Sequence, residues 1–324
     1  MDVRRWHGLA EVPLDWGRSV VAIGVFDGVH RGHQAILHTA AAHARRLKAR
    51  VVAVVFEPHP DVVVHGLPHP AVLTPAERKA ALLAEHGADA VCVLPFTREL
   101  SRLPAEEFVR RVLVDKLNAA VVAVGEDFRF GSDAAGDIST LRNLGEKYCF
   151  TVESIRLLGP ASGTGADRIS STRIRRYIAE GDVETAGAEL GRPHRVEGVI
   201  VHGAARGREL LGFPTANLDC PPETAVPADG VYAGRLLLTE PRDGAESCWP
   251  AAISVGTNPT FEGNTRTVEG YALDRDDLDL YGEPMAMEFL YRIRPQERFD
   301  NIEELIETMG RDVRRARELM AGEG

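Results

Sequence analysis

The sequence of 324 residues has few cysteines and no long hydrophobic run. Its four cysteines lie far apart, with no CxxC pair and no histidine cluster at metal-ligand spacing. We therefore expect neither a zinc site nor a disulfide framework, and a reducing compartment suits the chain. The longest apolar runs, such as residues 119–124, are far shorter than the ~20 residues that cross a bilayer. Because the N-terminus also lacks an apolar signal core, we expect a cytoplasmic protein.

Positive charge is scarce as well. The formal net charge is −10, and lysine occurs only at Lys48, Lys79, Lys116 and Lys147. This balance argues against a general binder of nucleic acid or of anionic membranes, because no large positive field exists to neutralise phosphates. Small molecules are the expected partners, bound by a monomer or a transient homo-oligomer.

In the first half of the chain, short apolar runs alternate with longer amphipathic stretches. The runs cover residues 20–25, 51–56, 90–94 and 121–124, and the amphipathic stretches cover 33–47, 75–86, 104–117 and 138–148. This alternation is typical of βα units around a parallel sheet that is buried on both faces. It predicts an α/β doubly wound, Rossmann-like domain.

Past residue 181 the pattern becomes β-rich and is interrupted by Gly and Pro, which predicts a small antiparallel β-barrel. A C-terminal helix should close it, with its apolar side chains on one face. These are Ile302, Leu305, Ile306, Met309, Val313, Ala316 and Leu319. We predict domains at 1–186 and 187–324, with a loop at 158–167 before the last motif of the first domain.

The first candidate site is the segment GVFDGVHRGHQ at residues 24–34. Its glycines permit a tight turn after a strand, and His30 and His33 stand at the start of a helix. A helix N-terminus offers free N–H groups and partial positive charge, so these imidazoles are well placed to hold nucleotide phosphates during nucleotidyl transfer. The alternative is an ordinary glycine-rich turn with solvated histidines.

Three further segments in this half carry polar groups. Residues 168–175, RISSTRIR, combine hydroxyls that suit a helix cap with arginines that suit an anion clamp. His59 in EPHPD, and Asp127, Phe128 and Arg129 in GEDFRFG, follow strands at the edge where such sheets bind ligands. Taken singly, each segment is equally well explained as a capped helix or a turn.

The second half contains GFPTANL at residues 212–218 and no Walker A motif. Thr215 and Asn217 offer two hard oxygen ligands suited to Mg²⁺. Glu269 offers a carboxylate that can take a proton from an attacking hydroxyl. The alternative is a proline-initiated turn and a surface carboxylate.

In their order and spacing these motifs resemble the prokaryotic bifunctional riboflavin kinase/FMN adenylyltransferase family. In the first half the resemblance implies an adenylyl-transfer pocket built from Gly24, Phe26, Asp27, Gly28, His30, Gly32 and His33. It also implies that the triphosphate is held by Arg168, Ser171, Thr172 and Arg175. Asp127, where many members carry Asn, would position the nucleotide or flavin. The other loop side chains are added to the expected flavin site: His59, Phe128 and Arg129.

For the second half, the resemblance implies that Thr215 and Asn217 ligate Mg-ATP and that Glu269 is the general base. It assigns ATP binding to a phosphate-covering loop and its surroundings: Gly203, Gly207, Arg208, Gly212, Phe213, Pro214 and Asn258. Residues 209–211 separate the GR pair from GFPTAN, where the family usually has two residues. The added residue predicts weaker ATP binding or a slower kinase half.

The resemblance thus implies an enzyme that uses Mg²⁺ and ATP to convert riboflavin to FMN, and then adenylylates FMN to FAD with release of pyrophosphate. One alternative is a related enzyme that transfers another nucleotide, such as CMP, or that acts on a modified flavin. Another is a flavin-binding protein with a weakened kinase half.

Overall fold

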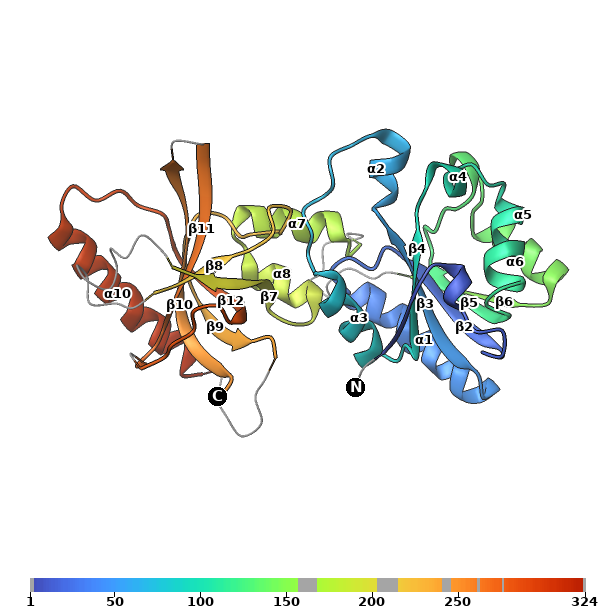
Figure 1. Ribbon diagram of the computed structural model, residues 1–324, viewed down its shortest axis with the longest axis horizontal. Helices are drawn as coiled ribbons and strands as arrows, with labels where there is room; N and C mark the ends of the chain where they lie inside the picture. The colour runs from blue at the N-terminus through green and yellow to red at the C-terminus, as the bar shows by residue number, and fades with distance from the viewer. Residues whose placement is uncertain are drawn as a thin grey trace. The chain divides into compact units, whose positions relative to one another are not determined.

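The computed structural model describes residues 3–156, 168–202, 215–240, 246–260, 263–275 and 277–322. The chain forms two compact units, each with its own hydrophobic core (Figure 1). The first unit comprises residues 1–70 and 74–171, and the second comprises 71–73 and 172–324. The chain therefore passes between the units three times.

The first unit is a parallel sheet with helices on both faces. Its strands are β1 (Arg4–His7), β2 (Ser19–Gly24), β3 (Arg50–Glu57), β4 (Ala90–Pro95), β5 (Ala119–Gly125) and β6 (Thr151–Ile155). Its helices are α1 (Arg31–Leu47), α2 (Pro60–His65), α3 (Ala76–Glu85), α4 (Arg98–Ser101), α5 (Ala105–Phe108) and α6 (Ile138–Tyr148). Short helical turns are η1 (Leu9–Glu11), η2 (Val109–Val114, π-helical, directly after α5) and η3 (Ser132–Ala134).

All strand pairs of this sheet are parallel, in the order β1-β4-β3-β2-β5-β6. Helices α1 and α3 pack on one face through Leu37 and Leu83, while η2 and α6 pack on the other through Leu113 and Leu141. Because both faces are covered, the central strands are almost continuously apolar. The predicted α/β doubly wound fold is confirmed.

The second unit is a closed antiparallel barrel. Its strands are β7 (His194–Val201), β8 (Ala216–Asp219), β9 (Gly230–Leu238), β10 (Cys248–Thr260), β11 (Gly263–Ala272) and β12 (Pro284–Pro295), in the order β10-β11-β8-β7-β12-β9. Its helices are α7 (Ser171–Glu180), whose first residue belongs to the first unit, α8 (Val183–Leu190) and α10 (Ile302–Met320). Strands β9 and β12 approach so closely at Gly234 that a Cβ there would lie 1.8 Å from the Glu288 carbonyl oxygen.

The C-terminal helix forms as predicted, but its contact face differs from the predicted stripe. Ile302 is 51% exposed and Ile306 37%, whereas Thr308 and Asp312 are buried. The Asp312 carboxylate receives hydrogen bonds from Arg294 on β12, with Nε–Oδ1 at 3.0 Å and Nη2–Oδ2 at 2.7 Å. Val313, Ala316 and Leu319 of the predicted stripe do pack against the barrel, and an ion pair extends this contact where apolar spacing gives no signal.

Candidate active sites

The first site lies at the topological switch point of the parallel sheet. Strand β2 pairs with both β3 and β5. From β2 the chain builds outward through β3 and β4, and it later returns to β5 on the other side of β2. The connections that leave β2 and β5 therefore run in opposite directions, and the crevice between such connections is where doubly wound sheets bind ligands. The predicted turn at residues 24–30 and the GEDFRFG loop both begin there.

The turn after β2 has an unusual backbone. Phe26, Gly28 and Val29 have left-handed φ values of 54°, 82° and 39°. Such values are uncommon for residues with a side chain and are costly for a β-branched one. Phe26 and Val29 are also fully buried, so packing holds the turn in this shape. The turn ends at His30, the N-cap of α1.

The turn brings the two predicted histidines together. The His30 Nδ1 accepts a hydrogen bond of 3.3 Å from the His33 backbone N–H. Their rings stack with centroids 3.6 Å apart, and the Phe26 ring meets His33 edge-on at 5.1 Å. Because Nδ1 accepts, a neutral His30 carries its proton on Nε2, which can donate to an oxyanion. The pair lies at the amino end of a 17-residue helix, where anions are stabilised.

The segment at 168–171 joins this crevice. The Arg168 Nη2 lies 2.5 Å from the Asp127 Oδ2, which links RISSTRIR to the loop after β5. The Ser171 hydroxyl donates to the Asp27 carbonyl oxygen at 2.8 Å. The Asp27 Oδ1 accepts a 3.2 Å hydrogen bond from the Thr74 backbone N–H, a contact that no sequence motif predicts.

The rest of the RISSTRIR segment lies in the second unit. Arg173 forms an ion pair with Glu189 on α8, whose side chain is only 2% exposed. This arginine therefore links α7 to α8. The Arg175 Nε donates to the Ala71 carbonyl oxygen at 2.6 Å. Thr172 stands in the first turn of α7.

Three predicted flavin-site residues occupy loops at the carboxyl edge of the sheet. His59 follows the cis Glu57–Pro58 bond and caps α2, with Nδ1 accepting from the Asp61 N–H at 3.2 Å. The Phe128 ring stacks on Phe130 with centroids 5.4 Å apart. Arg129 is exposed and lies 3.8 Å from the Asp137 carboxylate. These loops therefore offer aromatic surface and a cation next to the crevice.

In the barrel, the predicted kinase residues converge on one wall. Glu269 on β11 pairs directly with Asn217 on β8. Thr215 directly precedes β8, and its hydroxyl donates a hydrogen bond to the Glu269 carboxylate. The Asn217 side chain lies on the same face of the sheet as its pairing partner Glu269. That side is opposite to Leu218 and Val268, which fill the barrel core.

Glu269 has the properties of a base. Burial raises the pKa of its carboxyl group, and a hydrogen bond from the Thr215 hydroxyl partly opposes this shift. The neutral oxygens of Thr215 and Asn217 fit Mg²⁺, which takes few protein ligands and completes its shell with water and phosphate. No group of three or more His, Cys, Asp or Glu side chains suited to a metal occurs among the described residues.

A small pocket that is partly open to solvent adjoins this wall. Its lining is largely apolar, with Thr215 at one side and Arg275 and Tyr281 from the β11–β12 connection. The Tyr281 ring stacks on His202, with centroids 3.9 Å apart. At Gly270 a Cβ would lie 2.6 Å from the Leu236 side chain, so the interior has no room for one. Arg275 and His202 were not expected from the sequence.

Several predicted ATP-binding residues lie outside the described part of the chain: Gly203, Gly207, Arg208, Gly212, Phe213 and Pro214. The added residue within 209–211 and the loop at 158–167 also lie there. Asn258 is placed in β10, where its backbone pairs with Thr265. Among the described helices, none combines the length and hydrophobicity needed to cross a membrane.

Comparisons with known proteins match both units. A family model described as FAD synthetase matches residues 13–173, and one described as riboflavin kinase matches 190–320. Proteins named bifunctional riboflavin kinase/FMN adenylyltransferase are similar over nearly the whole chain. The one from Escherichia coli strain K12 is 35% identical over 98% of this chain and 96% of that protein. The one from Pseudomonas fluorescens is 38% identical over 97% of each.

A solved structure from Streptococcus pneumoniae, named as a macrolide-efflux protein, shares 31% identity with a TM-score of 0.85. It covers 98% of this chain and 99% of its own. One family model falls in each half of the chain, and the full-length relatives cover both halves. The chain belongs to the bifunctional riboflavin kinase/FMN adenylyltransferase family.

Proposed function

We propose that the chain makes FAD from riboflavin in two steps, with one step in each unit. The barrel transfers the γ-phosphoryl group of ATP to riboflavin, and the α/β unit transfers AMP from a second ATP to FMN. The observation that carries this proposal is the presence of two separate constellations: the stacked His30–His33 pair at the sheet crevice, and Glu269 with Thr215 and Asn217 on the barrel wall. We assign the functions to residues 1–186 and 187–324.

In the kinase step, Glu269 removes the proton from the ribityl 5′-hydroxyl as its oxygen attacks the γ-phosphorus of ATP. The raised pKa of its carboxyl group suits this role, because a base near the operating pH is more effective than a fully dissociated one. Thr215 and Asn217 would hold Mg²⁺, which neutralises charge on the transferring phosphate. The adjoining pocket with Tyr281 is the proposed place for the nucleoside, together with Asn258 and the loop at 203–214.

In the adenylyl step, a phosphate oxygen of FMN attacks the α-phosphorus of ATP, and pyrophosphate leaves with the electrons of the broken P–O bond. His30 and His33 donate hydrogen bonds to the oxygens on which charge builds, at the positive end of α1. Gly24, Phe26, Gly28 and Gly32 shape the pocket. No covalent enzyme intermediate is required, so catalysis consists of positioning and charge stabilisation.

The remaining residues hold the substrates. Arg168, Thr172 and Arg175 are the proposed triphosphate ligands, and Asp127 positions the nucleotide through its pair with Arg168. The proposed flavin residues on the loops are His59, Phe128 and Arg129. Mg²⁺ as cofactor, a cytoplasmic location, a monomeric or transiently oligomeric state and the lack of a nucleic-acid partner belong to the same proposal.

Pyrophosphate release with FMN as the supplied substrate tests the adenylyl step and its nucleotide. The protein is incubated with FMN, Mg²⁺ and each nucleoside triphosphate in turn, and the flavin product is identified by mass. We expect FAD and pyrophosphate in equal amounts with ATP. A cytidylyl or other nucleotidyl product at the higher rate would overturn the choice of nucleotide.

A further inference from the structure

Asp27 lies within the strained turn, between Phe26 and Gly28. Its side chain is buried, with only 6% of the residue exposed. Its Oδ1 accepts the Thr74 backbone N–H at 3.2 Å, and its carbonyl oxygen accepts the Ser171 hydroxyl at 2.8 Å. One residue of the turn thus binds two segments that are 47 and 144 residues away in the sequence.

These two segments are crossing points between the units. Residues 71–73 belong to the second unit, and the chain re-enters the first unit at Thr74. Within the second unit, the Val72 N–H donates to the Glu223 carbonyl oxygen at 2.7 Å, and Val72 accepts from the Ala225 N–H at 2.9 Å. The chain leaves the first unit for the last time after Ser171.

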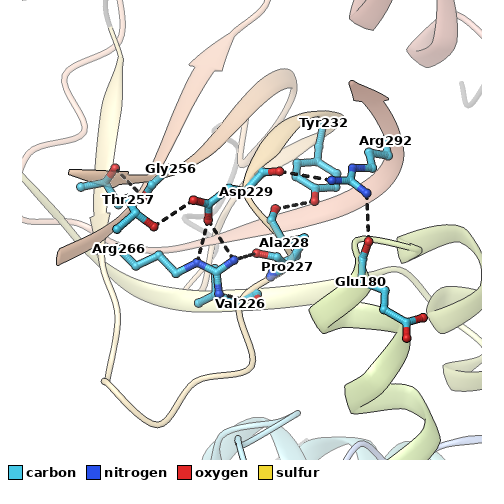
Figure 2. A network of polar contacts seen from close by, with 11 residues as sticks. Glu180, Val226, Pro227, Ala228, Asp229, Tyr232, Gly256, Thr257, Arg266 and Arg292 are labelled. Carbon is cyan, nitrogen blue, oxygen red and sulfur yellow. Dashed lines mark hydrogen bonds and ion pairs between the residues drawn. The ribbon is translucent and has the colours of Figure 1, made fainter. Parts of the chain in front are cut away.

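The far end of α7 is fixed on the barrel. Figure 2 shows Arg292 of β12 donating to the carbonyl oxygens of Glu180, at 2.9 Å, and Asp229, at 3.2 Å. Tyr232 holds the same loop by donating to the Ala228 carbonyl oxygen at 2.6 Å. The helix that begins at Ser171 is therefore held at its C-terminal end by side chains of the barrel.

A carboxylate next to a triphosphate repels it, whereas a buried carboxylate that accepts a backbone N–H is a strong anchor. Strained backbone persists only where its surroundings fix it, and both neighbours of Asp27 are in the left-handed region. Asp27 lies three residues before His30, and its contacts hold the strained turn that carries this histidine.

We propose that Asp27 is a positioning residue for adenylyl transfer: it fastens the turn that carries His30 and His33 to Thr74 and Ser171, which stand at two of the three points where the chain passes between the units. It acts on the reacting atoms through the histidines and does not contact the triphosphate itself. This proposal rests on the proposed adenylylation of FMN.

The test compares Asp27→Ala with Asp27→Asn in the full chain, using FMN and ATP as substrates. Alanine removes the acceptor, and displacement of the histidines should lower kcat about 10- to 100-fold with little change in KM for ATP. Asparagine keeps a side-chain oxygen and should restore most of the lost rate. An equal loss in both variants, with a raised KM for ATP, would show that the carboxylate serves the substrate and would overturn the proposal.

Ser171→Ala gives a second, milder perturbation, in which only one hydroxyl is removed. It should lower kcat, and its effect on kcat should be less than multiplicative with that of Asp27→Ala because both act on the same turn. If Asp27→Ala fails to fold, this variant decides, and an unchanged kcat would count against the proposal. Riboflavin phosphorylation in each sample reports on folding. If the unaltered chain makes no FAD, the proposed function fails instead.

Discussion

Replacement of Glu269 by glutamine separates the two proposed activities. Glutamine has the same shape and keeps an oxygen that accepts the Thr215 hydroxyl, so the local structure should survive. A neutral hydrogen bond contributes only about 1 kcal/mol, so even its partial loss would be a small effect. Glutamine cannot take a proton, however, and loss of a general base lowers a rate by about 10²- to 10⁴-fold. This corresponds to about 2.7–5.4 kcal/mol in the activation barrier, which exceeds any structural cost.

The assay measures the initial rate of FMN formation from riboflavin at saturating ATP, and the rate of FAD formation from supplied FMN in the same sample. We expect the first rate to fall by the stated factor and the second to stay unchanged. Glu288→Gln is the matched control, because Glu288 is a half-buried barrel carboxylate 3.8 Å from Arg235 and outside the proposed site. Wild-type phosphorylation by Glu269→Gln would refute the assignment of the base, and so would an equal loss in the Glu288→Gln control.

Three further predictions follow from the site and the core. The double change His30→Ala with His33→Ala should lower FAD formation at least about 100-fold and leave riboflavin phosphorylation intact, as flavin separation will show; loss of both activities would contradict the division between units. Because burial raises the pKa of Glu269 and the base acts unprotonated, phosphorylation should decline on acidification at a higher pH than an ordinary glutamate would give. Its pH–rate profile measures this, and a decline only in the ordinary carboxyl range would refute it. Asp312→Ala removes the main carboxylate partner of the partly buried Arg294, which keeps Glu297 at 3.8 Å, and should cost about 1.5–3 kcal/mol in urea unfolding of the barrel, whereas a cost below about 0.5 kcal/mol would show that the pair is dispensable.

Much of the fold was predictable because its central strands are buried on both faces. The four apolar runs of the first half correspond to β2, β3, β4 and β5. Strands β1 and β6 were missed. The burial pattern of β1, with the sequence RRWH, shows one buried residue, and β6 has none, so neither edge strand carries an apolar run. Edge pairing is set by the neighbouring strand, β4 or β5, and leaves little trace in local composition.

The candidate sites were predictable to the extent that their residues lie close together in the sequence. His30 and His33 lie three residues apart at the start of α1, and Thr215 and Asn217 lie two residues apart at the start of β8. The Asp27–Thr74 contact was not predictable, because a backbone N–H has no sequence signature. The pairing of Glu269 with Asn217 likewise depends on the strand order of the barrel, which only the three-dimensional structure reveals.

The most direct measurement follows flavins over time after the purified chain is mixed with riboflavin, Mg²⁺ and ATP. The proposed two-step conversion predicts that FMN accumulates first and that FAD then forms from it. One ADP is released per phosphorylation and one pyrophosphate per adenylylation. Riboflavin that remains unchanged, together with supplied FMN that is not converted, would contradict it.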